Sequence, residues 1–244
     1  MKPRTPAAAV LLIGLLAVGC SPEDLPERPG AASEAPTDAA PGGSDRASSA
    51  LAGLTVKGRA PKTGYDRDAF GSPWADVDGN SCPTRDDILQ RDLDEVKTGE
   101  DGCEVESGVL TDDPYTGTEI TFERGRSEVD IDHLVALSDA WQKGAQNWEP
   151  AKRIALANDP LNLLAVEASA NRQKGDGDTA TWLPANKEYR CAYVASQVAV
   201  KKKYELWVTE AEKKAMSGVL ETCTDQGLPT GNAPTEAPSR FSAG

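Results

Sequence analysis

The chain has 244 residues, of which 39% are hydrophobic, and it carries a formal net charge of −13 at pH 7. A chain of this length can bury one hydrophobic core. Its acidity argues against tight, salt-sensitive binding of nucleic acid, but permits a phosphodiester substrate contacted by a divalent cation and a local basic stripe. The composition therefore favours one folded domain. If the partner is a nucleic acid, the composition favours its role as a substrate over its role as a tightly bound ligand.

Residues 1–20 have the pattern of an export signal. Lys2 and Arg4 precede a short apolar stretch that ends in Leu-Ala-Val-Gly-Cys at residues 16–20. This ending resembles a bacterial lipoprotein signal, in which the cysteine is acylated, so Cys20 is the predicted lipidation site and would anchor the chain to a membrane. The alternative is an ordinary secretory signal that is cleaved nearby. Both interpretations predict an exported protein, either a cell-surface lipoprotein or a secreted one.

The composition predicts the limits of the folded domain. Residues 21–53 are rich in Pro, Ala, Gly, Ser and acids, and have too few large apolar side chains to offset the entropy of ordering. Residues 225–244 repeat this character. We therefore expect a disordered tether at 21–53, a folded domain at 54–224 and a disordered tail at 225–244.

The remaining cysteines predict disulfides. Without Cys20 the chain has Cys82, Cys103, Cys191 and Cys223, an even number with no Cys-x-x-Cys pair. In an exported protein this pattern favours two disulfides over a structural zinc site. Three pairings are possible, and we favour the local one, Cys82 with Cys103 and Cys191 with Cys223, because each bond would close a hairpin-like excursion.

The first predicted elements lead up to a single histidine. Residues 83–93 have the apolar spacing of a short amphipathic helix with Thr84 as a candidate N-cap. Residues 119–124 and 129–132 alternate with a period of two and are predicted strands that lead into His133.

Beyond this point the pattern is mainly helical. The predicted elements are a helical segment at 137–157 broken near 148–150, a short strand at 161–166, a helix capped by Ser169 and broken at Gly175, and helices at 189–206 and 209–220. Thr209 and Glu212 have the spacing of a capping box. The order of strands and helices predicts an α+β fold.

His133 is the only histidine in the chain. Imidazole is the side chain whose ordinary pKa lies near neutrality, so acid–base chemistry in this protein is expected to pass through His133. Asp132 directly precedes it and offers a carboxylate beside the base.

Three stretches together resemble a known family. They are residues 129–141 around Asp132 and His133, residues 158–164 around Asn162, and Ala-Asn-Arg-Gln-Lys-Gly-Asp at 170–176, which contains Asn171. The chain resembles HNH-family endonucleases of the ββα-metal type, and more narrowly the secreted Asp-His-Asn-Asn variants related to the C-terminal domain of GmrSD-type restriction endonucleases. The resemblance implies a ββα-metal (HNH, or His-Me finger) core within a mainly helical α+β domain.

The same resemblance implies roles for four residues. His133 would be the general base, Asp132 and Asn171 would be metal ligands, and Asn162 would orient His133. A site of carboxylate, amide and water oxygens suits Mg²⁺, with Mn²⁺ able to substitute. Asn162 and Asn171 also have structural interpretations, as a turn residue and as a residue near a helix N-terminus.

Two basic residues are candidates for substrate binding. Lys174 lies one turn after Asn171 on the same helix and is placed to meet a phosphate oxygen, while Arg85 is placed to clamp the substrate. A surface lysine and a structural salt bridge are the respective alternatives.

These inferences predict an exported, monomeric, metal-dependent endonuclease, without an evident protein partner, that hydrolyses DNA and, as an open alternative, RNA. Little sequence specificity is expected, because phosphate contacts carry no base information. A non-catalytic surface lipoprotein that uses the same fold for binding, and another metal-dependent phosphoesterase, are the competing hypotheses.

Overall fold

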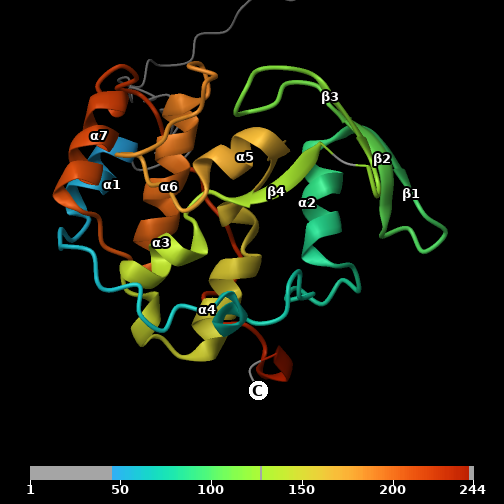
Figure 1. Cartoon of the computed structure of the whole chain (residues 1–244), viewed down its shortest axis with the longest axis horizontal. Helices are drawn as coiled ribbons and strands as arrows, with labels where there is room; N and C mark the ends of the chain where they lie inside the picture. The colour runs from blue at the N-terminus through green and yellow to red at the C-terminus, as the bar shows by residue number, and fades with distance from the viewer. Residues whose placement is uncertain (1–45, 127, 242–244) are drawn as a thin grey trace, which may run out of the picture. The chain divides into compact units, whose positions relative to one another are not determined.

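The computed structural model describes residues 46–126 and 128–241 (Figure 1). The predicted signal, Cys20 and most of the tether lie outside the described residues. Within the described ranges, no helix combines the length and apolar character needed to cross a membrane.

Two small antiparallel sheets organise the domain. Strands β1 (Asp94–Thr98), β2 (Val105–Leu110) and β3 (Ile120–Glu123) form one sheet in that order, and β4 (Val129–His133) pairs with β5 (Leu163–Glu167) to form the other. The predicted strands at 119–124 and 129–132 are confirmed as β3 and β4, but they belong to different sheets.

Helix α5 (Ala168–Lys174) follows β5 directly and packs against both β4 and β5. Helix α2 (Thr84–Asp92) also packs against this pair and against β2. Figure 1 shows β4 and α5 between the three-stranded sheet on one side and α1, α6 and α7 on the other. Two paired strands followed by a helix therefore form the centre of the domain, with residues 134–162 inserted between the strands.

Helices and 3-10 turns surround this centre. They are α1 (Ala47–Gly53), α3 (Leu137–Gln142), α4 (Pro150–Asn158), α6 (Arg190–Tyr204) and α7 (Glu210–Leu220), with the 3-10 turns η1 (Arg67–Phe70), η2 (Ala145–Asn147), η3 (Pro160–Asn162) and η4 (Ser239–Phe241). The predicted break near residues 148–150 separates η2 from α4. The α+β interpretation is confirmed.

The helix starts were predicted with mixed success. The capping box of Thr209 and Glu212 is present at α7. Thr84, in contrast, is the first residue of α2, and its hydroxyl donates to the Ala75 carbonyl oxygen at 2.6 Å. Helix α5 begins after Glu167, whose carboxylate accepts the backbone N–H groups of Ser169 and Ala170, so Ser169 is not the cap.

Both predicted disulfides are present, Cys82 with Cys103 and Cys191 with Cys223. The first joins the loop before α2 to the turn between β1 and β2. The second joins the start of α6 to the chain after α7. Each bond therefore closes one of the two local loops that the favoured pairing predicted.

The folded unit is longer than the composition predicts. Helix α1 lies within the segment expected to be a tether, and its Ala47 and Leu51 are buried against α6 and α7. In the expected tail, Ala237 is buried and its N–H donates to the Ala151 carbonyl oxygen at 3.0 Å. Small apolar side chains suffice to pack here, although their composition resembles that of a linker.

Six charged side chains are buried or half-buried together where α3, α6 and α7 meet. This buried charge cluster consists of Arg59, Lys143 and Lys201 with Asp139, Asp178 and Glu212. The Lys143 ammonium contacts Asp139, Asp178 and Glu212 at 2.8, 2.9 and 2.6 Å. Three cations balance three carboxylates, and the cluster ties α3, which follows His133 closely, to the helical side of the domain.

Candidate active site

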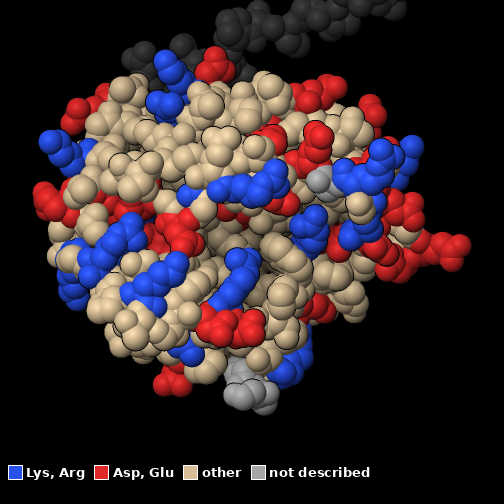
Figure 2. Space-filling model, in the orientation of Figure 1, with Lys and Arg blue, Asp and Glu red and all other residues tan. Residues whose placement is uncertain are grey.

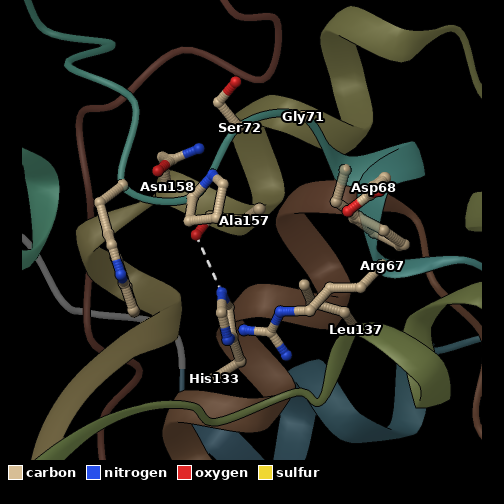
Figure 3. A pocket seen from close by; sticks show the side chains of 11 residues that line it. Arg67, Asp68, Gly71, Ser72, His133, Leu137, Ala157 and Asn158 are labelled. Atoms are coloured by element: carbon tan, nitrogen blue, oxygen red, sulfur yellow. Dashed lines mark hydrogen bonds between the residues drawn. The ribbon is translucent and has the colours of Figure 1, made fainter.

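His133 is the last residue of β4 and pairs with Leu163 of β5. Its side chain is buried, and Nε2 lies 2.9 Å from the Ala157 carbonyl oxygen (Figure 3). A carbonyl oxygen only accepts hydrogen bonds, so Nε2 carries the ring proton and donates it. Nδ1 is then the unprotonated nitrogen, which is the one that can accept a proton.

The surroundings of His133 favour the neutral ring. Burial lowers the pKa of His133 to about 3, and the positive charges of Arg67 and Lys174 act in the same direction, against the hydrogen bond to Ala157. The Trp74 indole stacks on the imidazole with 6.1 Å between ring centroids and 12° between planes. His133 is therefore a fixed, neutral imidazole at physiological pH.

Asp132 is held by two neighbours on the side of the strand that faces α5. Its Oδ2 accepts a 2.5 Å hydrogen bond from the Tyr115 hydroxyl, and the Lys174 ammonium lies 2.9 Å from the same oxygen. Burial raises the pKa of Asp132, while Lys174 and Tyr115 lower it. Burial also raises the pKa of Tyr115 well above its ordinary value, so the phenol remains a donor.

Lys174 does not occupy the position that the sequence predicts for a phosphate contact. It is 3% exposed, and its ammonium also donates to the backbone oxygen of His133 at 2.8 Å. Lys174 lies one helical turn after Asn171, as expected, but its side chain points toward the backbone of β4. Lys174 therefore binds the Asp132–His133 dipeptide and is not available to substrate.

Asn171 meets Asp132 and His133 at one hollow. The three residues line a cavity of about 200 Å³ together with Tyr65, Arg67, Ile131, Ala136, Leu137, Gly175 and Asp176. The amide nitrogen of Asn171 lies 3.4 Å from Asp130 Oδ2, which leaves its amide oxygen free to face a ligand. We call this cavity the catalytic hollow.

Asn162 contacts the backbone beyond His133 and not the imidazole. Its side-chain oxygen accepts the N–H of Val135 at 2.8 Å, and its backbone oxygen accepts the N–H of Leu134 at 2.8 Å. The predicted orienting role is therefore indirect, because Asn162 fixes the chain where β4 leaves the sheet. The ring itself is oriented by Ala157, which sequence reasoning did not identify.

Arg67 is a site residue that the sequence analysis missed. It is exposed, and it lines both the catalytic hollow and a smaller hollow of about 40 Å³ on the Trp74 side of His133. Figure 3 shows its guanidinium beside the His133 ring. No local motif marks Arg67, because η1 reaches the site only through the packing of η1 against α3 and α4.

The residues of the catalytic hollow fit a hard divalent cation held by few protein groups. Asp132 and Asn171 offer a carboxylate and an amide oxygen, and no group of three or more His, Cys, Asp or Glu side chains in the described ranges is arranged to hold a metal ion. Mg²⁺ is commonly bound by one or two carboxylates, with waters and substrate phosphate completing its shell. The ammonium of Lys174 on Asp132 weakens the attraction, so low affinity is expected.

A neutral histidine and a carboxylate from strand β4 and an amide from helix α5 meet at one hollow and define a candidate hydrolytic site. The family model of GmrSD restriction endonucleases, C-terminal domain, matches residues 83–219, and the chain belongs to this family. An uncharacterized secreted protein of Arthroderma benhamiae is 41% identical over 179 residues, which cover 72% of this chain and 84% of that protein. No solved structure matches the chain.

Proposed function

We propose that this chain is an exported, metal-dependent endonuclease with a ββα-metal core formed by β4, β5 and α5. The observation that carries the proposal is the catalytic hollow, where Asp132, His133 and Asn171 meet although Asn171 is distant in sequence. The family name, which refers to restriction endonucleases, supports the nuclease activity, and the secreted relative supports export.

The proposed chemistry begins at His133 Nδ1. The neutral ring accepts a proton from a water molecule as that water attacks phosphorus, and the bond to the leaving oxygen breaks. The hydrogen bond from Nε2 to Ala157 holds the ring in the required tautomer throughout. Such general base catalysis contributes about 10²- to 10⁴-fold to rate.

Asp132 and Asn171 are the proposed ligands of Mg²⁺, for which Mn²⁺ would substitute. The bound ion would supply positive charge to the phosphoryl oxygens. The substrate is DNA or RNA, bound with little sequence preference because the hollow offers contacts to phosphate and no base-reading element. We further propose that the protein acts as a monomer, and that Cys20 carries a lipid if the chain is anchored.

Plasmid cleavage tests the function directly. The wild-type protein with Mg²⁺ should nick and linearise plasmid DNA, chelator should stop cleavage, and His133→Ala should lower turnover about 10²- to 10⁴-fold while its thermal unfolding stays close to that of wild type. Absence of cleavage would favour a non-catalytic binding module. Hydrolysis of phosphomonoesters without cleavage of nucleic acid would favour another phosphoesterase.

A further inference from the structure

Among the described residues, two arginines near His133 form no salt bridge. Within the described part of the chain, neither Arg67 nor Arg85 lies within salt-bridge distance of a carboxylate. Other arginines in this region are paired, as Arg124 is with Asp86 and Glu104. Figure 2 shows Lys and Arg atoms bordering a hollow near the centre of this face, beside α2 and under α5. Two arginines at this face are therefore left without a salt bridge, although the chain as a whole is acidic.

Arg85 is the more unusual of the two, because it is half-buried. The carboxylate next to it in sequence, Asp86, is occupied by Arg124 and by the backbone N–H of Val105. Burial and the neighbouring charge of Arg124 lower the pKa of Arg85, while the carboxylates of Asp130 and Asp86, neither of which forms a salt bridge with it, act in the opposite direction. Removing a cation from water without giving it a partner is costly. An anion from outside the chain would relieve that cost.

Trp74 connects Arg85 to His133. The Arg85 guanidinium lies 5.9 Å from the centroid of the Trp74 ring, and that ring stacks on the imidazole. Trp74 has a φ of 59°, a left-handed conformation that a bulky residue adopts only where its surroundings impose it. Thr84 imposes it by donating its N–H to Trp74 and its hydroxyl to Ala75. Arg85 is thus held one aromatic ring away from the proposed base.

Arg67 is placed differently, with its guanidinium directly beside the His133 ring (Figure 3). It lines the hollows on both sides of His133. Arg67 and Arg85 therefore approach His133 from two directions, one directly and one across Trp74. A single phosphate in the catalytic hollow would meet Arg67 and leave Arg85 without a partner.

We propose that Arg67 and Arg85 bind two different phosphates of one nucleic-acid strand, Arg67 the phosphate that is cleaved and Arg85 a neighbouring one. This inference rests on the proposed nuclease function and specifies its substrate as a polynucleotide strand. The planar guanidinium fork matches phosphate geometry. A substrate with one phosphate would contact Arg67 and leave Arg85 unused.

Two substrates distinguish the proposed roles of Arg67 and Arg85. One is bis(p-nitrophenyl) phosphate, a diester with a single phosphate, and the other is a labelled single-stranded oligonucleotide. Arg85→Ala should lower kcat/KM about 10- to 100-fold more on the oligonucleotide than on the small diester, the range expected for a hydrogen bond to a charged group. Arg67→Ala should lower kcat/KM on both substrates. Arg85→Lys should recover part of the loss, and Arg46→Ala, which removes an exposed arginine paired with Asp225, is the matched control.

Binding gives a second readout that does not depend on turnover. In a His133→Ala background, fluorescence anisotropy of the oligonucleotide at several salt concentrations reports how many phosphates are neutralised. Arg85→Ala should reduce the slope of log affinity against log salt by about 0.7, the value for one phosphate of a single strand. An unchanged slope, or equal losses on both substrates, would overturn the second phosphate site and leave the nuclease standing. If wild-type protein cleaves neither substrate the nuclease fails instead, and the slope still decides the phosphate site.

Discussion

Asp132 is the residue whose surroundings do most to define the site. A buried carboxylate needs partners for its charge, and the domain supplies a phenol from Tyr115 and an ammonium from Lys174. Lys174 also binds the backbone of His133, so one buried cation fixes both residues of the dipeptide. The Asp132 carboxylate is therefore held rigidly, and its charge is partly neutralised. Such a group would position a ligand precisely but attract a cation only weakly.

Removing the hydroxyl of Tyr115 tests this placement. Tyr115→Phe deletes one oxygen atom and leaves Asp132 with Lys174 as its side-chain partner. We expect metal affinity or turnover to fall about 10- to 100-fold, the usual effect of removing a group that orients a metal ligand. Manganese binding measured by calorimetry, together with plasmid cleavage across a magnesium titration, would show whether the loss lies in affinity or in kcat.

Tyr193→Phe is the matched control. Tyr193 is buried in the same hydrophobic cluster, and its hydroxyl accepts a hydrogen bond from Gln197 at 2.9 Å without touching Asp132. Both variants should lose similar stability, and only Tyr115→Phe should change manganese binding. Equal effects on binding would mean that Tyr115 acts through packing alone.

At the level of single residues, adjacency marks Asp132 and His133, and the family resemblance adds Asn171, which lines the same hollow although it is distant in the chain. Asp132 and His133 are neighbours in the chain, and a lone histidine stands out by its chemistry. Tyr115 and Arg67 reach the site through tertiary packing, and no spacing rule links them to it. The burial of Lys174 against Asp132 was not predicted, because the face of a helix indicates the direction of a side chain and not its depth of burial.

The element that carries His133 is fixed at its end by neighbouring helices. Beyond β4 the chain turns at Leu134 and Val135, where Asn162 clamps the backbone. It then enters α3, whose Asp139 is at the centre of the buried charge cluster. The chain around His133 is thus fixed by the sheet before it and by the buried charge cluster after it, which limits movement of His133.

The buried charge cluster predicts how stability depends on pH. The pKa of Asp139 is lowered to about 2, because attraction to Lys201 and Lys143 outweighs the cost of burial, which acts in the opposite direction. With an ordinary value of 3.8 in the unfolded chain, Asp139 stabilises the fold above about pH 4, and this contribution is lost as the pH falls from about 4 to about 2. The shift corresponds to about 2 kcal/mol of unfolding free energy.

Asp139→Asn should therefore lower the melting temperature at pH 7 and flatten its fall between about pH 4 and pH 2. The cost at pH 7 should reach about 3 to 5 kcal/mol, because two buried lysines lose a shared partner. Asp112→Asn, at an exposed position, should leave both quantities close to wild type. A variant that melts in parallel with wild type across the acid range would remove Asp139 from the acid transition.

Among the elements, the strands and helices with clear periodicity were predicted, and those with unusual composition were not. Strand β1 is Asp-Glu-Val-Lys-Thr, mostly exposed, and such charged residues are depleted in strands, so tertiary pairing with β2 had to decide its structure. Helix α1 was hidden by its alanines and serines, which resemble a linker until the face against α6 is known. Both disulfides, by contrast, followed from cysteine spacing.

On the scale of the whole molecule, an acidic chain carries two arginines near His133 that form no salt bridge in the described residues. A net charge of −13 repels a polyanion at long range, so the proposed attraction to nucleic acid depends on local positive groups such as Arg67 and Arg85. At 0.1 M ionic strength, salt largely screens this repulsion at distances beyond about 10 Å.

The dependence on metal follows from this charge balance and is the most general prediction. Chelator should abolish cleavage, and Mg²⁺ or Mn²⁺ should restore it. Asp132→Asn should lose more activity than Asn171→Ala, because a charged ligand holds a hard cation more strongly than an amide does, and raised magnesium should partly rescue Asn171→Ala.

The asparagine substitution is preferred at position 132, because alanine would leave Lys174 as an unpaired buried charge. Asp176→Asn, which changes another carboxylate of the catalytic hollow, paired with Lys62, is the control and should bind manganese as wild type does. Cleavage that persists in excess chelator, or equal manganese binding by the Asp132→Asn and wild-type proteins, would remove the metal from Asp132 and with it the proposed mechanism.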